Sequence, residues 1–336
     1  MTSTWSTVPA KAGAVFRRQL DRAQRTLATR RSAPPRLIRT AAPDDLRRAI
    51  PRPSDRTLLR TSGWAMTIFA GLILGLLVHI VFISGLSEHR QQSLLFEQFR
   101  GQLAYGTAPI GQVGTDGQLL PPGSPVSLLS IPAAGVTDAV VVEGTTSSDL
   151  EAGPGHRRDT PLPGQVGVSV VYGRQFAYGG PFGQISTLAV GDTITTTTGQ
   201  GPATYRVVDV RYAGDAAPPM PSNGSRLTLV SLRGVPFLGS DVVRIDADLV
   251  GKAQPTPQPV LRPGTLAASE DPLASDPSGW LPMFLLLELA LVVGVLMILA
   301  LRRWGRFHTW IVGVPVIIAV GGALAREILV VLPNLY

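Results

Sequence analysis

Cysteine and histidine side chains most often carry nucleophilic attack, proton transfer or metal binding, and this sequence is poor in both. It contains no cysteine, which excludes a thiolate nucleophile, a disulfide and a cysteine-ligated metal. Its four histidines lie far apart in sequence, without the spacing of metal ligands: His79, His89, His156 and His308. We therefore expect no metal site and no cofactor.

Three apolar runs organise the chain around these residues. Each is long enough to cross a bilayer, and they cover residues 63–86, 280–301 and 309–331. The preceding residues 1–62 hold 14 Lys and Arg against four Asp, lack an apolar period, and are expected to form a largely disordered cytoplasmic arm. Arginines in the short loop at residues 302–308 place that loop inside as well. The predicted protein spans the plasma membrane three times, with its C-terminus outside.

Ionisable residues inside the apolar runs form a predicted polar cluster. At about 1.5 Å per residue, His79, Glu288 and Arg326 reach comparable heights in the three spans. Because charge is costly in a membrane, we predict that Glu288 pairs with Arg326, with His79 or Glu327 nearby. Such a cluster could lock the helices together, contact another membrane subunit or form a proton path.

A β-rich domain is expected between the first and second spans. Residues 126–250 alternate short apolar runs with Gly, Pro and Asp turns, which is typical of a mainly β barrel or sandwich. Within it, residues 168–182 and 227–232 have the pattern of buried strands that deliver residues to one site. Residues 87–125 should form a membrane-proximal amphipathic helix and a connector. Residues 251–279, rich in Pro, Ala and Ser, should form a flexible linker.

Several motifs in this β-rich domain resemble those of the sortases, and in particular the actinobacterial housekeeping-like type. Sortases are membrane-anchored transpeptidases of Gram-positive bacteria. The resemblance covers about 120 residues and implies a closed β-barrel of about eight strands. The motifs occur in the family's order and are IPAAGV (131–136), VVEGTT (141–146), GPGH (153–156), TPLPGQ (160–165), YGGPF (178–182), VGD (190–192) and LTLV (227–230).

The resemblance also places the family's three catalytic side chains. A sortase uses a Cys nucleophile, a His acid and base, and an Arg that steadies the oxyanion. At the corresponding positions this sequence has Leu232, Arg174 and Val242. An aliphatic side chain cannot attack a carbonyl group, and a permanently charged guanidinium is a poor general acid.

Three other residues are candidates to replace the missing catalytic side chains. Ser231 precedes the Cys position, but its side chain should face the other side of the strand, without an activating His. Arg244 shares a strand face with Val242 and could reach the cleft or lie at a solvated edge. His156 matches a family segment that lacks the catalytic His, so we interpret it as a structural loop residue.

The sequence therefore predicts a catalytically inactive sortase-like domain that binds or scaffolds partners in a bacterial cell-envelope complex. Arg174, with Arg233 or Arg244, would leave the former cleft basic, so that a peptide or an anionic wall polymer could bind there. Other membrane or envelope proteins are the expected partners, and nucleic acid is not. Two alternatives remain open: a divergent transpeptidase or hydrolase, and an accessory subunit of a transporter or secretion machine.

Overall fold

The structure is a computed structural model that describes residues 73–235 and 241–336. The basic arm expected at residues 1–62 and the first part of the span expected at residues 63–86 lie outside the described residues.

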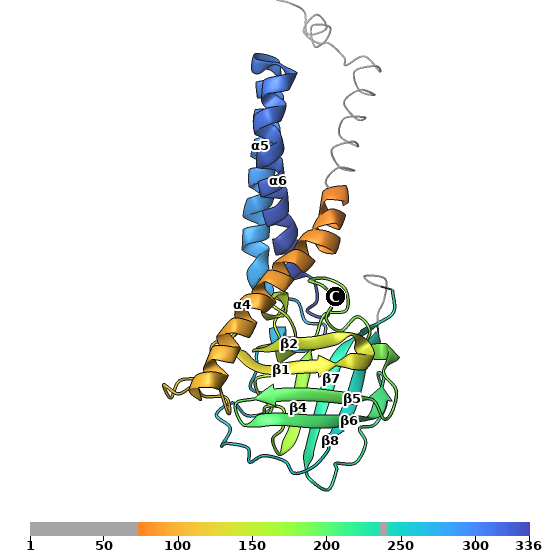
Figure 1. The fold of residues 1–336 in the computed structure, drawn as a ribbon. Helices are drawn as coiled ribbons and strands as arrows, with labels where there is room; N and C mark the ends of the chain where they lie inside the picture. The colour runs from red at the N-terminus through yellow and green to blue at the C-terminus, as the bar shows by residue number, and fades with distance from the viewer. Residues whose placement is uncertain (1–72, 236–240) are drawn as a thin grey trace, which may run out of the picture. The chain divides into compact units, whose positions relative to one another are not determined.

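The β-rich domain is a closed barrel, as predicted (Figure 1). The strands follow the order β1-β2-β3-β4-β7-β8-β6-β5 around it. Neighbouring strands are antiparallel except for the pairs β2–β3 and β4–β7, which are parallel. The named strands of the described residues are β1 (Pro125–Ile131), β2 (Val136–Glu143), β3 (Gly155–His156), β4 (Gly167–Tyr172), β5 (Thr193–Thr198), β6 (Gly201–Arg211), β7 (Ser225–Arg233) and β8 (Asp241–Leu249).

Strand β7 is buried on both of its faces. Side chains alternate along a strand, so Leu227 and Leu229 point into the barrel core, whereas Val230 and Leu232 belong to a second apolar cluster. Eight of the nine residues of β7 are buried, and only Arg233 is exposed. The face that carries Val230 and Leu232 must therefore be covered by chain from outside the barrel.

A long helix precedes the barrel and packs against it (Figure 1). The short π-helical turn η1 (His79–Ile83) leads into α4 (Ser84–Tyr105), close to the amphipathic helix expected after residue 87. Phe99 of α4 is fully buried. Gln92 donates from Nε2 to the carbonyl oxygens of Val140 (3.0 Å) and Ala152 (2.6 Å), and its Oε1 accepts from the Val140 N–H. These contacts fix α4 against β2 and the loop that follows it.

Two helices close the chain and lie side by side, α5 (Trp280–Trp304) and α6 (Arg306–Val331) (Figure 1). In the part of the chain that the structure describes, only these two helical stretches, Pro277–Ala300 and Phe307–Val331, are long and apolar enough to cross a membrane. A Cβ atom added to Gly313 would meet Met297 Sδ at 2.2 Å, so the absent side chain permits their close approach. Three spans were predicted; the described part of the first one continues helically into η1.

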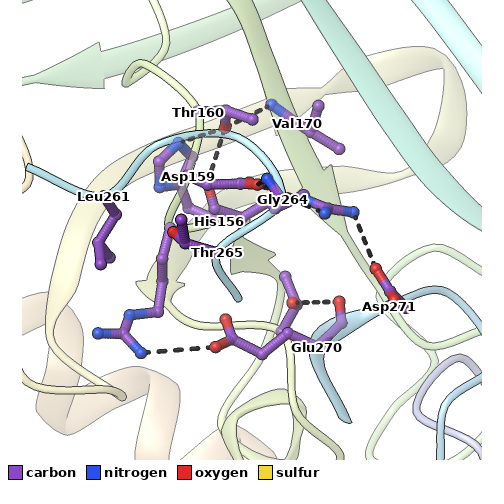
Figure 2. Close-up of polar contacts among 12 residues, drawn as sticks. His156, Asp159, Thr160, Val170, Leu261, Gly264, Thr265, Glu270 and Asp271 are labelled. Atoms are coloured by element: carbon purple, nitrogen blue, oxygen red, sulfur yellow. Dashed lines mark hydrogen bonds and ion pairs between the residues drawn. The ribbon is translucent and has the colours of Figure 1, made fainter. Parts of the chain in front are cut away.

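The segment at residues 251–279 differs from the flexible linker expected from its composition. It lies along the barrel and is held by polar contacts, several of which Figure 2 shows. The Gly264 N–H donates to Asp159 Oδ2 (3.1 Å), and Arg157 and Arg158 pair with Asp271 (3.4 Å) and Glu270 (3.5 Å). A Pro-, Ala- and Ser-rich composition does not exclude order when a folded neighbour supplies partners for the main chain and the acidic side chains.

Candidate functional site

The three positions that the resemblance assigns to catalysis meet at one end of β4, β7 and β8. Leu232 in β7 is the register partner of Val242 in β8. Arg174 follows β4 by two residues, and β4 runs parallel to β7. The preceding Gly173 fixes this end, because its N–H donates to the Val230 carbonyl oxygen and a Cβ atom there would meet the Phe182 ring at 2.3 Å. The strand topology therefore brings these three positions to the same end of the barrel.

Arg174 is fully buried, so it does not line an open cleft. Its Nη2 donates to the Ser147 carbonyl oxygen (2.6 Å), its Nη1 donates to the Tyr336 main-chain carbonyl oxygen (3.1 Å), and its guanidinium carbon lies 5.0 Å from the centre of the Tyr178 ring. Burial lowers the pKa of Arg174 to about 10, so the side chain stays cationic at neutral pH. The nearby carboxylate of Glu151 opposes that shift. In this structure Arg174 faces groups of the same chain, instead of lining the open basic cleft that the sequence predicts.

The chain that follows α6 covers this end of the barrel. Leu335 is fully buried in one apolar cluster with Leu150, Tyr172, Val230 and Leu232, and Val242 and Tyr336 pack against that cluster. The Gln175 N–H donates to the Leu335 carbonyl oxygen (2.9 Å). Residues 332–336 therefore supply the outer cover that β7 requires. Sequence reasoning missed this segment, since its only local signal is Pro333, which ends the helix without indicating a destination.

The other two arginines proposed for the cleft have separate environments. Arg233 is exposed, and its guanidinium carbon lies 4.9 Å from the centre of the Tyr212 ring. Arg244 is half-buried and pairs in register with Val230. Burial raises the pKa of the Tyr172 hydroxyl, and the charge of Arg244 partly opposes this rise. Neither residue joins Arg174 in an open basic surface, because Arg174 is closed to solvent.

Ser231 and His156 both have structural partners. Ser231 is fully buried and its Oγ donates to the Gly173 carbonyl oxygen at 2.8 Å. His156 is fully buried in β3, with Nδ1 2.8 Å from Glu143 Oε2 and Nε2 3.0 Å from the Pro161 carbonyl oxygen. Figure 2 shows His156 among Asp159, Thr160 and Val170. The geometry offers Ser231 no histidine base, and it agrees with the structural role predicted for His156.

The polar cluster predicted inside the membrane does not form as expected. Arg326 Nη2 lies 3.2 Å from Oε2 of Glu151, a buried carboxylate in the loop before β3, so the predicted pairing with Glu288 is wrong. Arg326 stands near the C-terminal end of α6, where its side chain reaches the barrel instead of the neighbouring helix. Glu288 is exposed on α5, Glu327 is half-buried, and His79 Nδ1 has no hydrogen-bond partner among the described residues.

No metal centre is evident in the part of the chain that the structure describes. There, no group of three or more His, Cys, Asp or Glu side chains has the geometry to hold an ion. The carboxylate of Glu151 lies near Arg174, and this group is paired with Arg326. The arrangement can bind main-chain carbonyl groups and apolar side chains.

Known proteins match the barrel region of this chain. A family model described as Sortase domain matches residues 129–231. A sortase D5 transpeptidase from Clostridium perfringens is 22% identical, over 48% of this chain and 99% of its own, with a TM-score of 0.38. Sortase E from Streptomyces avermitilis is 27% identical, over 45% of this chain and 100% of its own, with a TM-score of 0.33. A search of curated proteins found no match.

The family match covers β4 and most of β7 but not β8. It runs from β1 into β7, includes Arg174, and stops one residue before Leu232. The helices α5 and α6 and the segment that closes the site lie outside it. The barrel region of this chain therefore matches the sortase domain model over residues 129–231, and the absence of cysteine from the sequence is consistent with a degenerate sortase domain.

Proposed function

We propose that this protein is a non-catalytic binding or scaffold subunit of a bacterial cell-envelope complex. One observation carries the proposal: the three positions that do chemistry in a sortase hold an apolar pair, Leu232 and Val242, and a buried cation, Arg174. The barrel has kept the shape of a peptide-processing domain. What it can offer a partner is a rigid surface and a membrane anchor.

Acyl transfer through a covalent intermediate requires a nucleophile and a base within hydrogen-bond reach of each other. The Cys position holds Leu232, and the hydroxyl beside it, Ser231 Oγ, donates to a main-chain carbonyl inside the barrel. Arg174 is a cation with carbonyl partners, so it cannot accept the proton of a nucleophile. The divergent transpeptidase or hydrolase that the sequence left open has no observation in its favour.

The proposed location is the plasma membrane, with α5 and α6 as spans. Their large apolar side chains are mostly exposed, which a lipid environment would cover. Arg302, Arg303 and Arg306 flank the turn between the two helices, and this favours a cytoplasmic turn with the barrel outside. A third span at residues 63–86 and a cytoplasmic arm at residues 1–62 remain part of the proposal. Partners would be other membrane or envelope proteins.

The activity test uses the full chain in detergent micelles. The protein is incubated with a library of peptides and an amine acceptor, and intact-mass spectrometry follows both the peptides and any acyl adduct on the protein. We expect no cleavage, no transfer and no adduct. Turnover that Ser231→Ala abolishes would overturn the proposal. Turnover that Ser231→Ala leaves unchanged is measured again with protein refolded from the pure denatured chain, which lacks contaminating enzymes. Turnover that persists there would also overturn the proposal.

A second experiment separates a scaffold from an accessory transport subunit. Membranes are cross-linked and mildly solubilised, and the full chain is purified with its bound partners. We expect envelope proteins among these partners, and no nucleotide-binding or channel subunit. Stoichiometric recovery of such a subunit would favour the transport role instead.

A further inference from the structure

Main-chain contacts hold residues 332–336 in the degenerate site. The Gln175 N–H donates to the Leu335 carbonyl oxygen at 2.9 Å, and Arg174 Nη1 donates to the Tyr336 carbonyl oxygen at 3.1 Å. Both donors come from the chain directly after β4. Two consecutive carbonyl groups are thus recognised by two consecutive residues of the barrel, which is how proteins bind an extended peptide.

Two side chains of the same segment are buried against the barrel. Leu335 and Asn334 are both 0% exposed. Leu335 lies in the apolar cluster of Leu232, and Asn334 Nδ2 donates to the carbonyl oxygens of Thr145 (2.8 Å) and Asp271 (3.0 Å). One apolar side chain and one amide, both buried, give the interaction a side-chain specificity that main-chain contacts alone lack.

The segment also joins the site to α6. Ser147 Oγ donates to the Leu332 carbonyl oxygen at the end of α6 (2.9 Å), and the Ser147 carbonyl oxygen accepts from Arg174 Nη2 (2.6 Å). Six residues earlier, on α6, Arg326 pairs with Glu151 of the same barrel loop. A single barrel loop therefore binds the end of α6 and orients the guanidinium that binds the segment after it.

From these contacts we infer that the former catalytic cleft is a peptide-binding groove used within the chain, with residues 332–336 as its ligand. The groove selects an extended peptide in which a residue with a buried side-chain amide precedes a residue with a buried aliphatic side chain. Arg174 and Gln175 donate hydrogen bonds to the main-chain carbonyl groups of this peptide. Its occupancy fastens the barrel to α6. An external peptide of the same chemistry can bind only when the segment leaves.

This inference rests on the proposed function, because a site that still processed peptides would turn over its occupant. It also explains the cation at the position where a sortase has histidine. A guanidinium can donate to the segment and to Ser147 at once, as it does here. Leu232 and Val242 then complete the apolar surroundings of Leu335.

The absence of cysteine permits a direct test with a single reporter thiol. Leu232→Cys is made in the full chain in nanodiscs, and the rate of maleimide labelling is compared with that of Thr187→Cys, an exposed position on the barrel. The Leu232→Cys thiol should react at least 100-fold more slowly. Adding Leu335→Asp should raise its rate at least tenfold, whereas the conservative Leu335→Met should leave it slow.

A peptide in trans then tests the groove itself. The pentapeptide LPNLY, added at millimolar concentration to the Leu232→Cys, Leu335→Asp protein, should slow labelling again, and a scrambled peptide of the same composition should not. Circular dichroism checks that each variant keeps its β-sheet signal; if Leu335→Asp unfolds the barrel, Leu335→Ala replaces it. The inference is overturned if Leu232→Cys labels as fast as Thr187→Cys, or if LPNLY gives no protection. Turnover by the unaltered chain would instead overturn the proposed function.

Discussion

Arg174 and Tyr336 stand 162 residues apart in the chain and are joined by a 3.1 Å hydrogen bond from a buried guanidinium to a main-chain carbonyl oxygen. A buried cation is costly unless its donors are satisfied and a countercharge is near. Nη1 donates to Tyr336 and Nη2 donates to Ser147, whereas Nε has no hydrogen-bond partner among the described residues, and the carboxylate of Glu151 lies nearby. The charge of Arg174 is thus a structural element of the interface between the barrel and residues 332–336.

Replacing Arg174 should therefore be among the most destabilising single changes in the barrel. Arg174→Met keeps much of the side-chain volume. It removes the hydrogen-bond donor of the Ser147 and Tyr336 carbonyl oxygens, and it removes a positive charge near Glu151. We expect a loss of about 3 kcal/mol in the free energy of unfolding. Denaturant unfolding of the full chain in micelles, followed by the β-sheet circular dichroism signal, measures it. The matched change Arg244→Met, at a half-buried arginine, should cost less than about 0.5 kcal/mol.

Gln92 should be the main polar anchor of α4 on the barrel. Gln92→Ala removes two donated hydrogen bonds and one accepted hydrogen bond, and leaves the Val140 N–H without its partner. The expected loss is about 1 to 3 kcal/mol. Hydrogen exchange of the Val140 amide should accelerate at least tenfold. Gln98→Ala on the same helix, at an exposed position, is the control and should change neither quantity. Equal protection of Val140 in both variants would contradict the role given to Gln92.

The barrel could be predicted because the sequence patterns that indicate it each lie within a few neighbouring residues. Short apolar strands separated by Gly, Pro and Asp turns define a mainly β domain, and the motifs that resemble sortase motifs placed Arg174, Leu232 and Val242 together. The helical spacing of Leu94, Leu95 and Phe99 likewise predicted α4 to within a few residues. These signals depend on neighbours within a few positions of each other, so a sequence displays them directly.

The contacts that close the site could not be predicted, because they join residues far apart in sequence. Arg326 has acidic candidates in Glu288 and Glu327, and nothing in the spacing indicates that it reaches Glu151, 175 residues earlier. Arg174 was expected to be open to solvent because its cover, residues 332–336, carries no distinctive composition. The order of residues 251–279 was missed for the same reason: their partners are barrel loops, and composition reports only what a segment does alone.

Stability should fall as the pH rises, in part through His156. Burial alone lowers the pKa of His156, but the carboxylate of Glu143, with the Pro161 carbonyl and Asp159, outweighs burial and raises the net pKa above the ordinary 6.5. A histidine with a raised folded-state pKa contributes stability that is complete below 6.5 and is lost as the pH rises through the folded-state pKa.

Denaturation midpoints of the unaltered chain and of His156→Gln, taken between pH 5 and pH 9, measure this contribution. The difference between the two proteins should be largest at low pH and should shrink as the pH rises. His89→Gln, at an exposed histidine of α4, is the control and should keep the pH dependence of the unaltered chain. A difference that grows with pH would show that His156 is neutral in the folded protein.

The partner of Arg326 can be identified by two double-mutant cycles. The ion pair with Glu151 joins a guanidinium that is 59% exposed to a carboxylate that is 6% exposed, so solvent screens it and the coupling should be small. We expect about 0.5 to 1 kcal/mol between Arg326→Met and Glu151→Gln. The cycle with Glu288→Gln should give no coupling, because Glu288 is exposed on α5 and has no ion pair with Arg326 in the described structure. Coupling to Glu288 and none to Glu151 would mean that Arg326 faces the neighbouring helix, and the barrel would then lose its charged contact with α6.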